Sequence, residues 1–191
     1  MAQAAPAHLD GGGWRRRGGG RTDAAPGARR GGAGDAPFDQ VASDGGLLNA
    51  IERLDPAVVT VTRQMVLGGG RGGRTINGQS MLTTAEMEDI SNALRVRLGD
   101  LERWDVVNSS RNTHLFHIHD VQFQILDRNG AAPGPTEPGR KDTVLVRPGE
   151  TVPLLMLFTD YADPGTPYMY HCHILQHEDQ GMMGQFVVVP A

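Results

Sequence analysis

The stretch YHCHILQHEDQGMM at residues 170–183 holds three of the chain's seven histidines, its single cysteine and two of its eight methionines. A second short stretch, HLFHIH at residues 114–119, holds three more histidines. Chance rarely gathers six of seven histidines into two such short segments. The sequence therefore predicts metal sites built from imidazole and sulfur ligands.

Strand geometry sorts these side chains into two groups, because successive residues of a strand point to opposite faces. His117 and His119 fall on one face and His114 on the other. The side chain of Cys172 likewise points to the opposite face from those of its two histidine neighbours. The expected groups are His114, Cys172, His177 and Met182 on one side, and His117, His119, His171 and His173 on the other.

The ligand types of the first group favour copper. Two imidazoles and a thiolate with a weak axial thioether form the ligand set of blue-copper electron-transfer centres. Zinc is the competing interpretation, because histidine-rich sites accept it readily. The thioether of Met182 argues for copper, since zinc has little use for such a ligand.

From Leu47 onward the chain consists of short runs of β-branched and aromatic residues bounded by glycine, proline and asparagine, a pattern typical of an all-β sandwich or barrel. Trp104 and Phe116 are expected in its core. Turns are expected at 77–78, 129–130, 133–138, 148–149 and 163–167, a capped helical turn at 83–88, and a solvated loop at 71–74. The expected strands are 57–67, 95–107, 114–126, 143–147, 151–158, 168–173 and 185–189.

Residues 1–46 form a segment of different composition, which holds twelve of the 26 glycines and no hydrophobic period. Such a segment buries too little apolar surface to offset the conformational entropy that it would lose on folding. We therefore expect a disordered Gly/Arg/Ala-rich leader before a domain at 47–191. A mis-assigned or frame-shifted start and an arginine-rich RNA-binding arm are the alternatives. The six arginines of residues 1–46 are interrupted by acidic residues, so they make only a weak basic patch for RNA.

The charge and hydropathy of the sequence disfavour nucleic acid and membrane as partners, and they bear on export. The formal net charge of −4 gives no general case for nucleic acid binding. The longest apolar run, 152–158, is far shorter than the roughly 20 residues of a membrane helix. The basic residues near the N-terminus run into glycines rather than an apolar segment, so no export signal is visible.

The two histidine stretches resemble those of the C-terminal cupredoxin domain of multicopper oxidases, in particular the bacterial cuprous oxidase, bilirubin oxidase and laccase group. INGQ at 76–79, LGDLERW at 98–104 and KDTV at 141–144 support the resemblance, which spans roughly 47–190. It implies an all-β, cupredoxin-like Greek-key β-barrel or sandwich. Two positions depart from the family pattern, with Asp120 in place of the usual glycine and Leu115 in place of the usual proline.

The resemblance also implies a role for each residue of the two groups. Cys172 would pass electrons from the type 1 copper, and Glu178 would relay protons to oxygen. The implied type 1 ligands are His114, Cys172, His177 and Met182; the implied type 2 ligand is His117; and the implied type 3 ligands are His119, His171 and His173.

By the same resemblance the protein is a copper-dependent oxidoreductase that takes electrons from a small reducing substrate, phenol-type or Cu(I), and reduces O2 to water. The family's trinuclear site needs eight histidines, four of them from an N-terminal domain. Beyond the two stretches this chain has only His8, which we expect to be a bystander. Relatives are generally periplasmic or extracellular.

Three explanations of the missing histidines stay open. The chain is a fragment of a full oxidase, or a subunit completed by a partner chain, or a stand-alone blue-copper electron carrier without oxidase activity.

Overall fold

The computed structural model describes residues 51–70 and 73–191. The leader predicted for residues 1–46 and the domain start at residue 47 lie outside this range.

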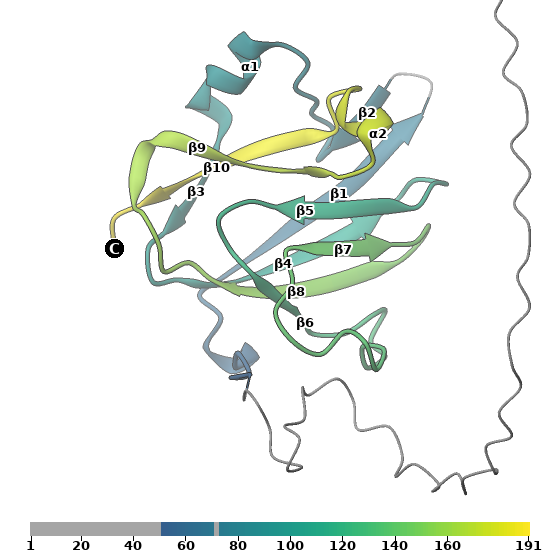
Figure 1. Ribbon diagram of the computed structural model, residues 1–191, viewed down its shortest axis with the longest axis vertical. Coiled ribbons are helices and arrows are strands. Elements are labelled where there is room, and N and C mark those ends of the chain that lie inside the picture. The colour runs from purple at the N-terminus through teal and green to yellow at the C-terminus, as the bar shows by residue number, and fades with distance from the viewer. Residues whose placement is uncertain (1–50, 71–72) are drawn as a thin grey trace, which may run out of the picture. The chain divides into compact units, whose positions relative to one another are not determined.

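Two five-stranded sheets form the described part of the chain (Figure 1). Most neighbouring strands are antiparallel, whereas β1 with β4 and β3 with β10 are parallel. From β4 to β9 successive strands alternate between the two sheets. The first sheet has the order β2 (Gly73–Ile76), β1 (Val61–Gly70), β4 (Leu101–Asn108), β8 (Thr151–Leu157), β6 (Phe123–Ile125). The second has the order β3 (Leu94–Arg97), β10 (Met183–Val189), β9 (Asp163–Cys172), β5 (His114–Ile118), β7 (Thr143–Val146).

The turn η1 (Pro56–Val58) precedes β1, and three short helical turns connect strands: α1 (Thr84–Glu88), η2 (Ile90–Asn92) and α2 (Leu175–Glu178). The predicted capped turn is confirmed, because Thr83 and Glu86 form a reciprocal capping box at the start of α1. The turn α2 lies within the stretch 170–183, contains His177 and was not predicted. It is a single turn, too short to give a helical hydrophobic period.

The core lies between the sheets and is centred on Trp104, which is fully buried as expected together with Phe116. The indole meets Tyr170 and Phe186 edge to face, with ring centroids 5.6 and 6.0 Å apart. Such edge contacts are favourable because the positive rim of one ring faces the negative face of the other.

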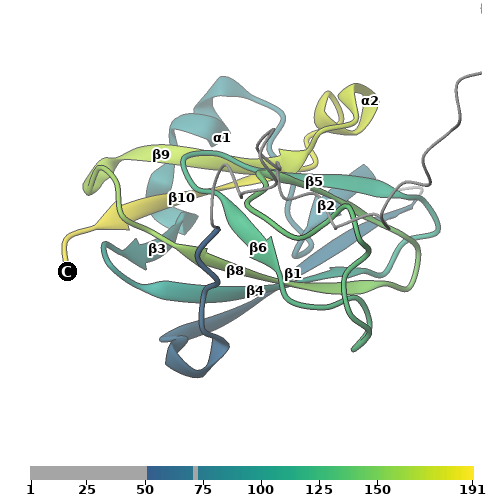
Figure 2. The same cartoon turned by 60° about the horizontal axis from the view of Figure 1, so that its bottom comes forward.

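Strand β8 is buried on both faces, which explains its nearly continuous apolar sequence TVPLLML. Its inner face meets the core. Its outer side is covered by the chain before η1, seen beside β6 and β8 in Figure 2. Gln124 of β6 holds that segment, since its side chain accepts from Leu54 N at 3.0 Å and donates to Glu52 O at 2.6 Å.

Two predicted strands are each divided by a residue with positive φ. The strand expected at 95–107 is broken at Gly99, with φ of 88°, and that expected at 114–126 is broken after Ile118, with Asp120 at φ of 70°. A residue in the left-handed region cannot continue a strand. The pattern of apolar residues does not reveal where the chain breaks, because the strands on both sides of each break face the same core.

Two local predictions are wrong. Gly73 and Arg74 were expected in a solvated loop, but they open strand β2, where Arg74 pairs with Gly69; residues 71–72 lie outside the described range. The turn expected at 163–167 is the start of β9. Residues that precede proline favour extended backbone, which accounts for the extended conformation of Asp163 and Thr166. The turn at Asn77-Gly78 is present, with both residues at positive φ.

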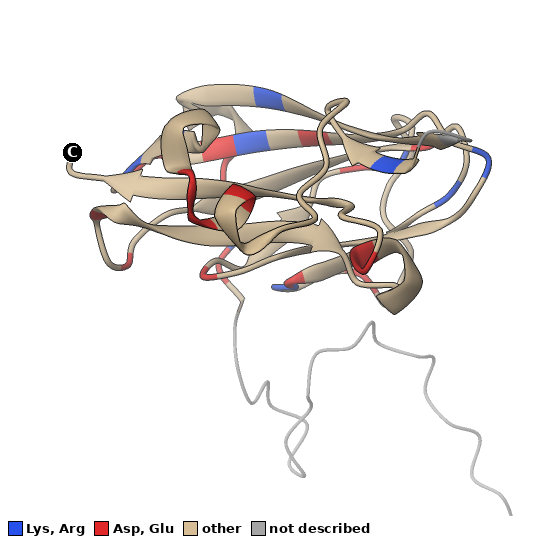
Figure 3. Ribbon diagram, turned by 90° about the horizontal axis from the view of Figure 1, so that it is seen from above, with Lys and Arg blue, Asp and Glu red and all other residues tan. Residues whose placement is uncertain are grey.

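Acidic and basic residues are interspersed along the strands of the described chain (Figure 3). None of the helices in residues 51–70 and 73–191 is long and apolar enough to span a membrane.

A buried ion pair ties β1 to β4 within the first sheet. Glu102 is fully buried and accepts two hydrogen bonds from Arg63, at 2.7 and 2.8 Å. The same carboxylate accepts the indole N–H of Trp104 at 2.7 Å. A buried carboxylate needs such partners, because desolvation of an unpaired charge costs several kcal/mol.

Replacing Glu102 by glutamine is expected to lower the free energy of unfolding by about 3 kcal/mol, because it leaves Arg63 without its anionic partner. Asp105→Asn is the matched control in the same strand, since the Arg103–Asp105 pair is partly exposed at 36% and 23%. This control should change stability by no more than about 0.5 kcal/mol. Denaturant unfolding of both variants measures the difference, and equal losses would contradict the interpretation.

Candidate metal centres

Strands β5 and β9 bring the two histidine stretches together in a fixed register. Phe116 lies opposite Cys172, and His117 lies opposite His171. Residues that face each other across an antiparallel pair share one side of the sheet. The buried and half-buried positions alternate along β5, with His114 facing the core and His117 facing outward. The two groups predicted from strand geometry are therefore brought together on opposite faces of this sheet.

Three atoms converge on the core side, and we call His114, Cys172 and His177 together with Met182 the sulfur group. His114 Nδ1 lies 3.1 Å from His177 Nδ1. Cys172 Sγ lies 3.5 Å from His114 Nδ1 and 3.3 Å from His177 Nδ1. A point equidistant from the three atoms lies about 1.9 Å from each, close to the roughly 2.0 to 2.3 Å of metal bonds to nitrogen and sulfur. The donor atoms thus fit a trigonal metal ion.

The backbone after Cys172 folds back so that His177 and Met182 return to it. Within this loop His177 N donates to Ile174 O at 2.7 Å, and Met182 N donates to His177 O at 3.0 Å. Cys172 N donates to Met182 O at 3.0 Å, and the Met182 side chain is fully buried. A loop closed by these hydrogen bonds brings the backbones of Cys172, His177 and Met182 together.

A buried hydroxyl orients the ring of His114. Its Nε2 lies 2.8 Å from Ser110 Oγ, which also lies 2.8 Å from Asn108 Oδ1. The three groups can all form hydrogen bonds when the Ser110 hydroxyl donates to Asn108 Oδ1 and accepts a hydrogen bond from the Nε2–H of His114. The Nδ1 lone pair then faces the thiol, as metal binding requires. Sequence reasoning missed Asn108 and Ser110, whose only signal is a polar pair placed between apolar strands.

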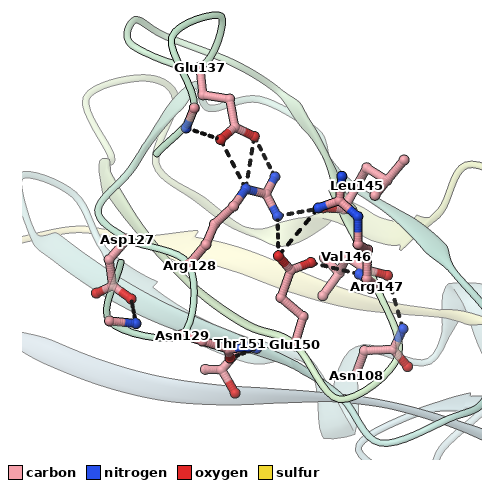
Figure 4. Close-up of polar contacts among 12 residues, drawn as sticks. Asn108, Asp127, Arg128, Asn129, Glu137, Leu145, Val146, Arg147, Glu150 and Thr151 are labelled. Atoms are coloured by element: carbon pink, nitrogen blue, oxygen red, sulfur yellow. Dashed lines mark hydrogen bonds and ion pairs between the residues drawn. The ribbon is translucent and has the colours of Figure 1, made fainter. Parts of the chain in front are cut away.

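Asn108, in β4 of the first sheet, is in turn held by β7 of the second sheet. Its Nδ2 donates to Val146 O in β7 at 2.9 Å (Figure 4). The neighbouring Leu145 O accepts from Arg128 at 3.0 Å, and Arg128 also binds Glu137 and Glu150 at 2.9 Å. This ion-pair network fixes the strand whose carbonyl holds Asn108, and thereby supports the site from outside.

The outward face carries the second set, His117, His119, His171 and His173, which we call the imidazole group. Neighbouring rings have centroids 5.2 to 5.5 Å apart. His119 Nε2 and His171 Nε2 are 3.2 Å apart. The ring nitrogens of His117, His119 and His171 lie within 4.8 Å of one another, and His173 is close to two of these rings. Four imidazoles so close together suit a site for more than one metal ion.

The stretch KDTV fixes the tautomer of His117. Its Nδ1 lies 2.9 Å from both Asp142 O and Thr143 Oγ1. A carbonyl oxygen only accepts, so Nδ1 carries the proton and Nε2 keeps its lone pair for a metal.

Glu178 lies at the edge of the imidazole group. Its Oε2 is 3.5 Å from Nδ1 of His171, and the carboxylate keeps about a third of its surface exposed. Burial lowers the pKa of His171, and the charge of Glu178 opposes that shift. Glu178 is thus placed between solvent and a buried imidazole. His8 lies outside the described residues.

Burial controls the protonation of the sulfur group. It lowers the pKa of His114 to about 4, with further lowering by His177 and Arg74. It also lowers the pKa of His177, with Arg74 acting in the same direction. The pKa of the Cys172 thiol is raised, mainly by burial. At neutral pH the two imidazoles therefore offer free lone pairs, whereas the thiol must lose a proton when it binds a metal.

The two departures from the family pattern have different surroundings. Asp120 has φ of 70°, a conformation that glycine adopts freely and aspartate tolerates better than most residues. Asp120 and Tyr168 line an open depression of about 520 Å³ beside His117 and His119. Leu115 lies half-buried opposite Leu145 in a regular strand pair.

The free energy of unfolding of the metal-free chain is expected to rise with pH from about 4 to 6.5. The pKa of His114 is about 4 in the folded chain and 6.5 by its ordinary value, so in this window the unfolded state binds more protons. Unfolding in the presence of a chelator at about pH 4.5 and about pH 7 measures the change. His114→Gln should reduce this slope, and stability that falls as the pH rises through this window would contradict the expectation.

Comparison with known proteins identifies the family of the chain. The profile of the family Multicopper oxidase matches residues 59–191. The laccase of Haloferax volcanii is 37% identical over 141 residues, covering 70% of this chain and 23% of the laccase. The multicopper oxidase mco of Staphylococcus aureus is 42% identical over 91 residues, covering 46% of this chain and 20% of that protein.

The solved structure of the McoA multicopper oxidase from Aquifex aeolicus matches with a TM-score of 0.66 and 31% identity, covering 75% of this chain and 32% of that one. The predicted cupredoxin-like fold class is thereby confirmed. The chain spans about a fifth to a quarter of the length of the two relatives named above. Since the family profile covers more than half of its residues, the chain belongs to the multicopper oxidase family.

Proposed function

We propose that this chain is the C-terminal copper-binding domain of a laccase-like multicopper oxidase that moves electrons from a reducing substrate to O2. The observation that carries the proposal is the triangle of His114 Nδ1, His177 Nδ1 and Cys172 Sγ, with sides of 3.1, 3.3 and 3.5 Å. Two imidazoles and one thiol in this arrangement are the equatorial ligand set of blue-copper centres.

The sulfur group would hold the type 1 copper, with Met182 supplying a thioether. The imidazole group would supply half of the trinuclear ligands, His117 for type 2 and the other three for type 3. When bound, copper at the sulfur group supplies one-electron chemistry, and copper at the imidazole group supplies the O2-reducing site. Zinc is a weaker candidate for the sulfur group because a buried thioether has little affinity for it.

Cys172 connects the two groups. Its thiolate belongs to the sulfur group, while its sequence neighbours His171 and His173 belong to the imidazole group. An electron that reaches the sulfur therefore has a short covalent route through one residue of backbone on either side. Burial of Cys172 keeps water away from this route.

Glu178 would hold and pass protons at the edge of the imidazole group. Its carboxylate, about a third exposed to solvent and 3.5 Å from His171 Nδ1, can take a proton from water and hold it beside the cluster. Reduction of O2 to water consumes protons, and a carboxylate in this place would supply them.

The remaining assignments rest on the family resemblance. The substrate would be a small reductant, phenol-type or Cu(I), and the protein would act in the periplasm or outside the cell. Four further trinuclear histidines would come from an N-terminal domain or a partner chain. The exposed edge of His173 leaves room for such ligands.

Purified chain supplied with Cu(II) is expected to develop the intense blue charge-transfer absorption of a copper–thiolate bond. Cys172→Ser should abolish this band, because it removes the sulfur ligand, whereas Met169→Leu, on the same strand outside both groups, should keep it. Absorption and electron paramagnetic resonance spectra measure the outcome. Colourless wild-type protein, or an unchanged band in Cys172→Ser, would refute the proposal.

Ser110→Ala is expected to weaken copper binding at the sulfur group by about 10-fold to 100-fold, because the His114 ring loses the partner that fixes its tautomer. Ser109→Ala is the matched control, since Ser109 Oγ bonds Leu67 O instead of a histidine. Competition with a copper chelator measures both affinities. Equal affinities for the two variants would show that Ser110 does not orient His114.

Oxygen uptake distinguishes an oxidase domain from an electron carrier. We expect O2 consumption with a phenolic donor only when the chain is combined with a domain that supplies the missing histidines. One bound copper per chain and no uptake with any such domain would favour the blue-copper carrier.

A further inference from the structure

Thr143 opens strand β7 directly opposite His117 of β5, the strand beside it in Figure 1. Residues that face each other across an antiparallel pair place their side chains on the same side of the sheet. The Thr143 hydroxyl accordingly lies beside the His117 ring, with its oxygen 2.9 Å from Nδ1. The register of β5 with β7 therefore brings this hydroxyl to the ring, just as the register with β9 brings His171 to it.

The carboxylate of Asp142 sets the direction in which this hydroxyl points. Thr143 Oγ1 donates to Asp142 Oδ1 at 3.0 Å. A hydroxyl has one proton to donate, so the Thr143 oxygen then offers only lone pairs to His117. It accepts the Nδ1–H of the ring, which Asp142 O also accepts at 2.9 Å. Carboxylate, hydroxyl and imidazole thus form one hydrogen-bonded relay.

The backbone at Asp142 is fixed to both sheets. Ile118 N of β5 donates to Asp142 O at 3.1 Å. Lys141, the preceding residue, exchanges two backbone hydrogen bonds with Phe123 of β6, at 2.7 and 2.9 Å. Phe123 is fully buried in the core. The relay therefore begins at a segment that the sandwich itself holds in place.

The two acceptors on Nδ1 do different things for the ring of His117. The Asp142 carbonyl determines which nitrogen carries the proton, and the Thr143 hydroxyl further restricts rotation of the ring. Ring nitrogens of His117, His119 and His171 lie within 4.8 Å of one another, so the orientation of His117 matters for a shared metal site. Loss of such a partner typically lowers metal affinity about 10-fold to 100-fold.

We propose that Thr143 is a positioning residue of the imidazole group: directed by the Asp142 carboxylate, its hydroxyl holds His117 with Nε2 free to bind copper. The inference rests on the proposed function, in which His117 is a copper ligand. Two side chains that are not themselves ligands thereby gain a role, in addition to the tautomer that the backbone of Asp142 sets.

Nitrogen NMR of isotope-labelled, metal-free protein tests the positioning by itself. At about pH 8, where an imidazole is ordinarily neutral, the shifts of the two ring nitrogens show which one carries the proton. We expect His117 of the wild type to be held in the Nδ1–H form. Thr143→Val replaces the hydroxyl by a methyl group of similar size, and should populate the Nε2–H form as well. Thr143→Ser keeps the hydroxyl and should match the wild type.

Copper affinity is the second measurement. Competition with a chelator, followed by electron paramagnetic resonance of the copper that is not blue, reports binding at the imidazole group. We expect Thr143→Val to weaken this binding about tenfold, and Thr143→Ser to restore most of it. Asp142→Ala should act in the same direction as Thr143→Val, because it leaves the hydroxyl undirected. Thr60→Val is the matched control, since its hydroxyl donates to Leu101 O at 3.1 Å rather than to a histidine.

The blue band of the sulfur group should be unchanged in all of these variants, which shows that each is folded. Unchanged tautomer and affinity in Thr143→Val would overturn the inference, as would an equal loss of affinity in Thr60→Val. If Thr143→Val does not fold, Asp142→Ala supplies the same comparison, because Asp142 is exposed. Wild-type protein that binds no copper refutes the proposed function, whereas the NMR measurement still decides whether Thr143 positions His117.

Discussion

The register between β5 and β9 is the constraint on which both metal groups depend. Phe116 opposite Cys172 and His117 opposite His171 place one ligand set on each face of a single sheet. A slip of one residue would turn the cysteine outward and the histidines inward. The register is held by the core, because the same pairing buries Phe116 and Ile118 between the sheets. The packing that stabilises the sandwich therefore also assembles the sites.

Two buried polar side chains beside the sulfur group, Asn108 and Ser110, both have hydrogen-bond partners. Asn108 and Ser110 connect His114 to the carbonyl of Val146, and the ion pairs of Arg128 hold the strand to which that carbonyl belongs. Unpaired polar groups in this position would cost stability and let the imidazole rotate. The result is a ligand whose lone pair already faces the thiol before metal binds.

Fold class, core and the division of ligands were predictable because they follow from short-range patterns. Alternation along β5 separates His114 from His117 whatever the rest of the chain does, and the apolar runs define most of the strands. The breaks at Gly99 and Asp120 were not predictable, because the apolar pattern is the same on both sides of each reversal. The edge strand β2 was missed because its glycine and arginine have little strand propensity and are held there by pairing with β1.

The sequence by itself determined which residue types could bind metal and which of them share a face, since both depend on composition and a period of two residues. Tertiary structure alone decided the orientation of each donor. Ser110 fixes the His114 ring, the carbonyl of Asp142 fixes His117, and the turn α2 returns His177 to the thiol. Asp142 is 25 residues from His117 and reaches it only through the pairing of β5 with β7. Ser110 and His177 lie close in sequence to the residues they meet, but outside the strands, where the two-residue period of a strand predicts no orientation.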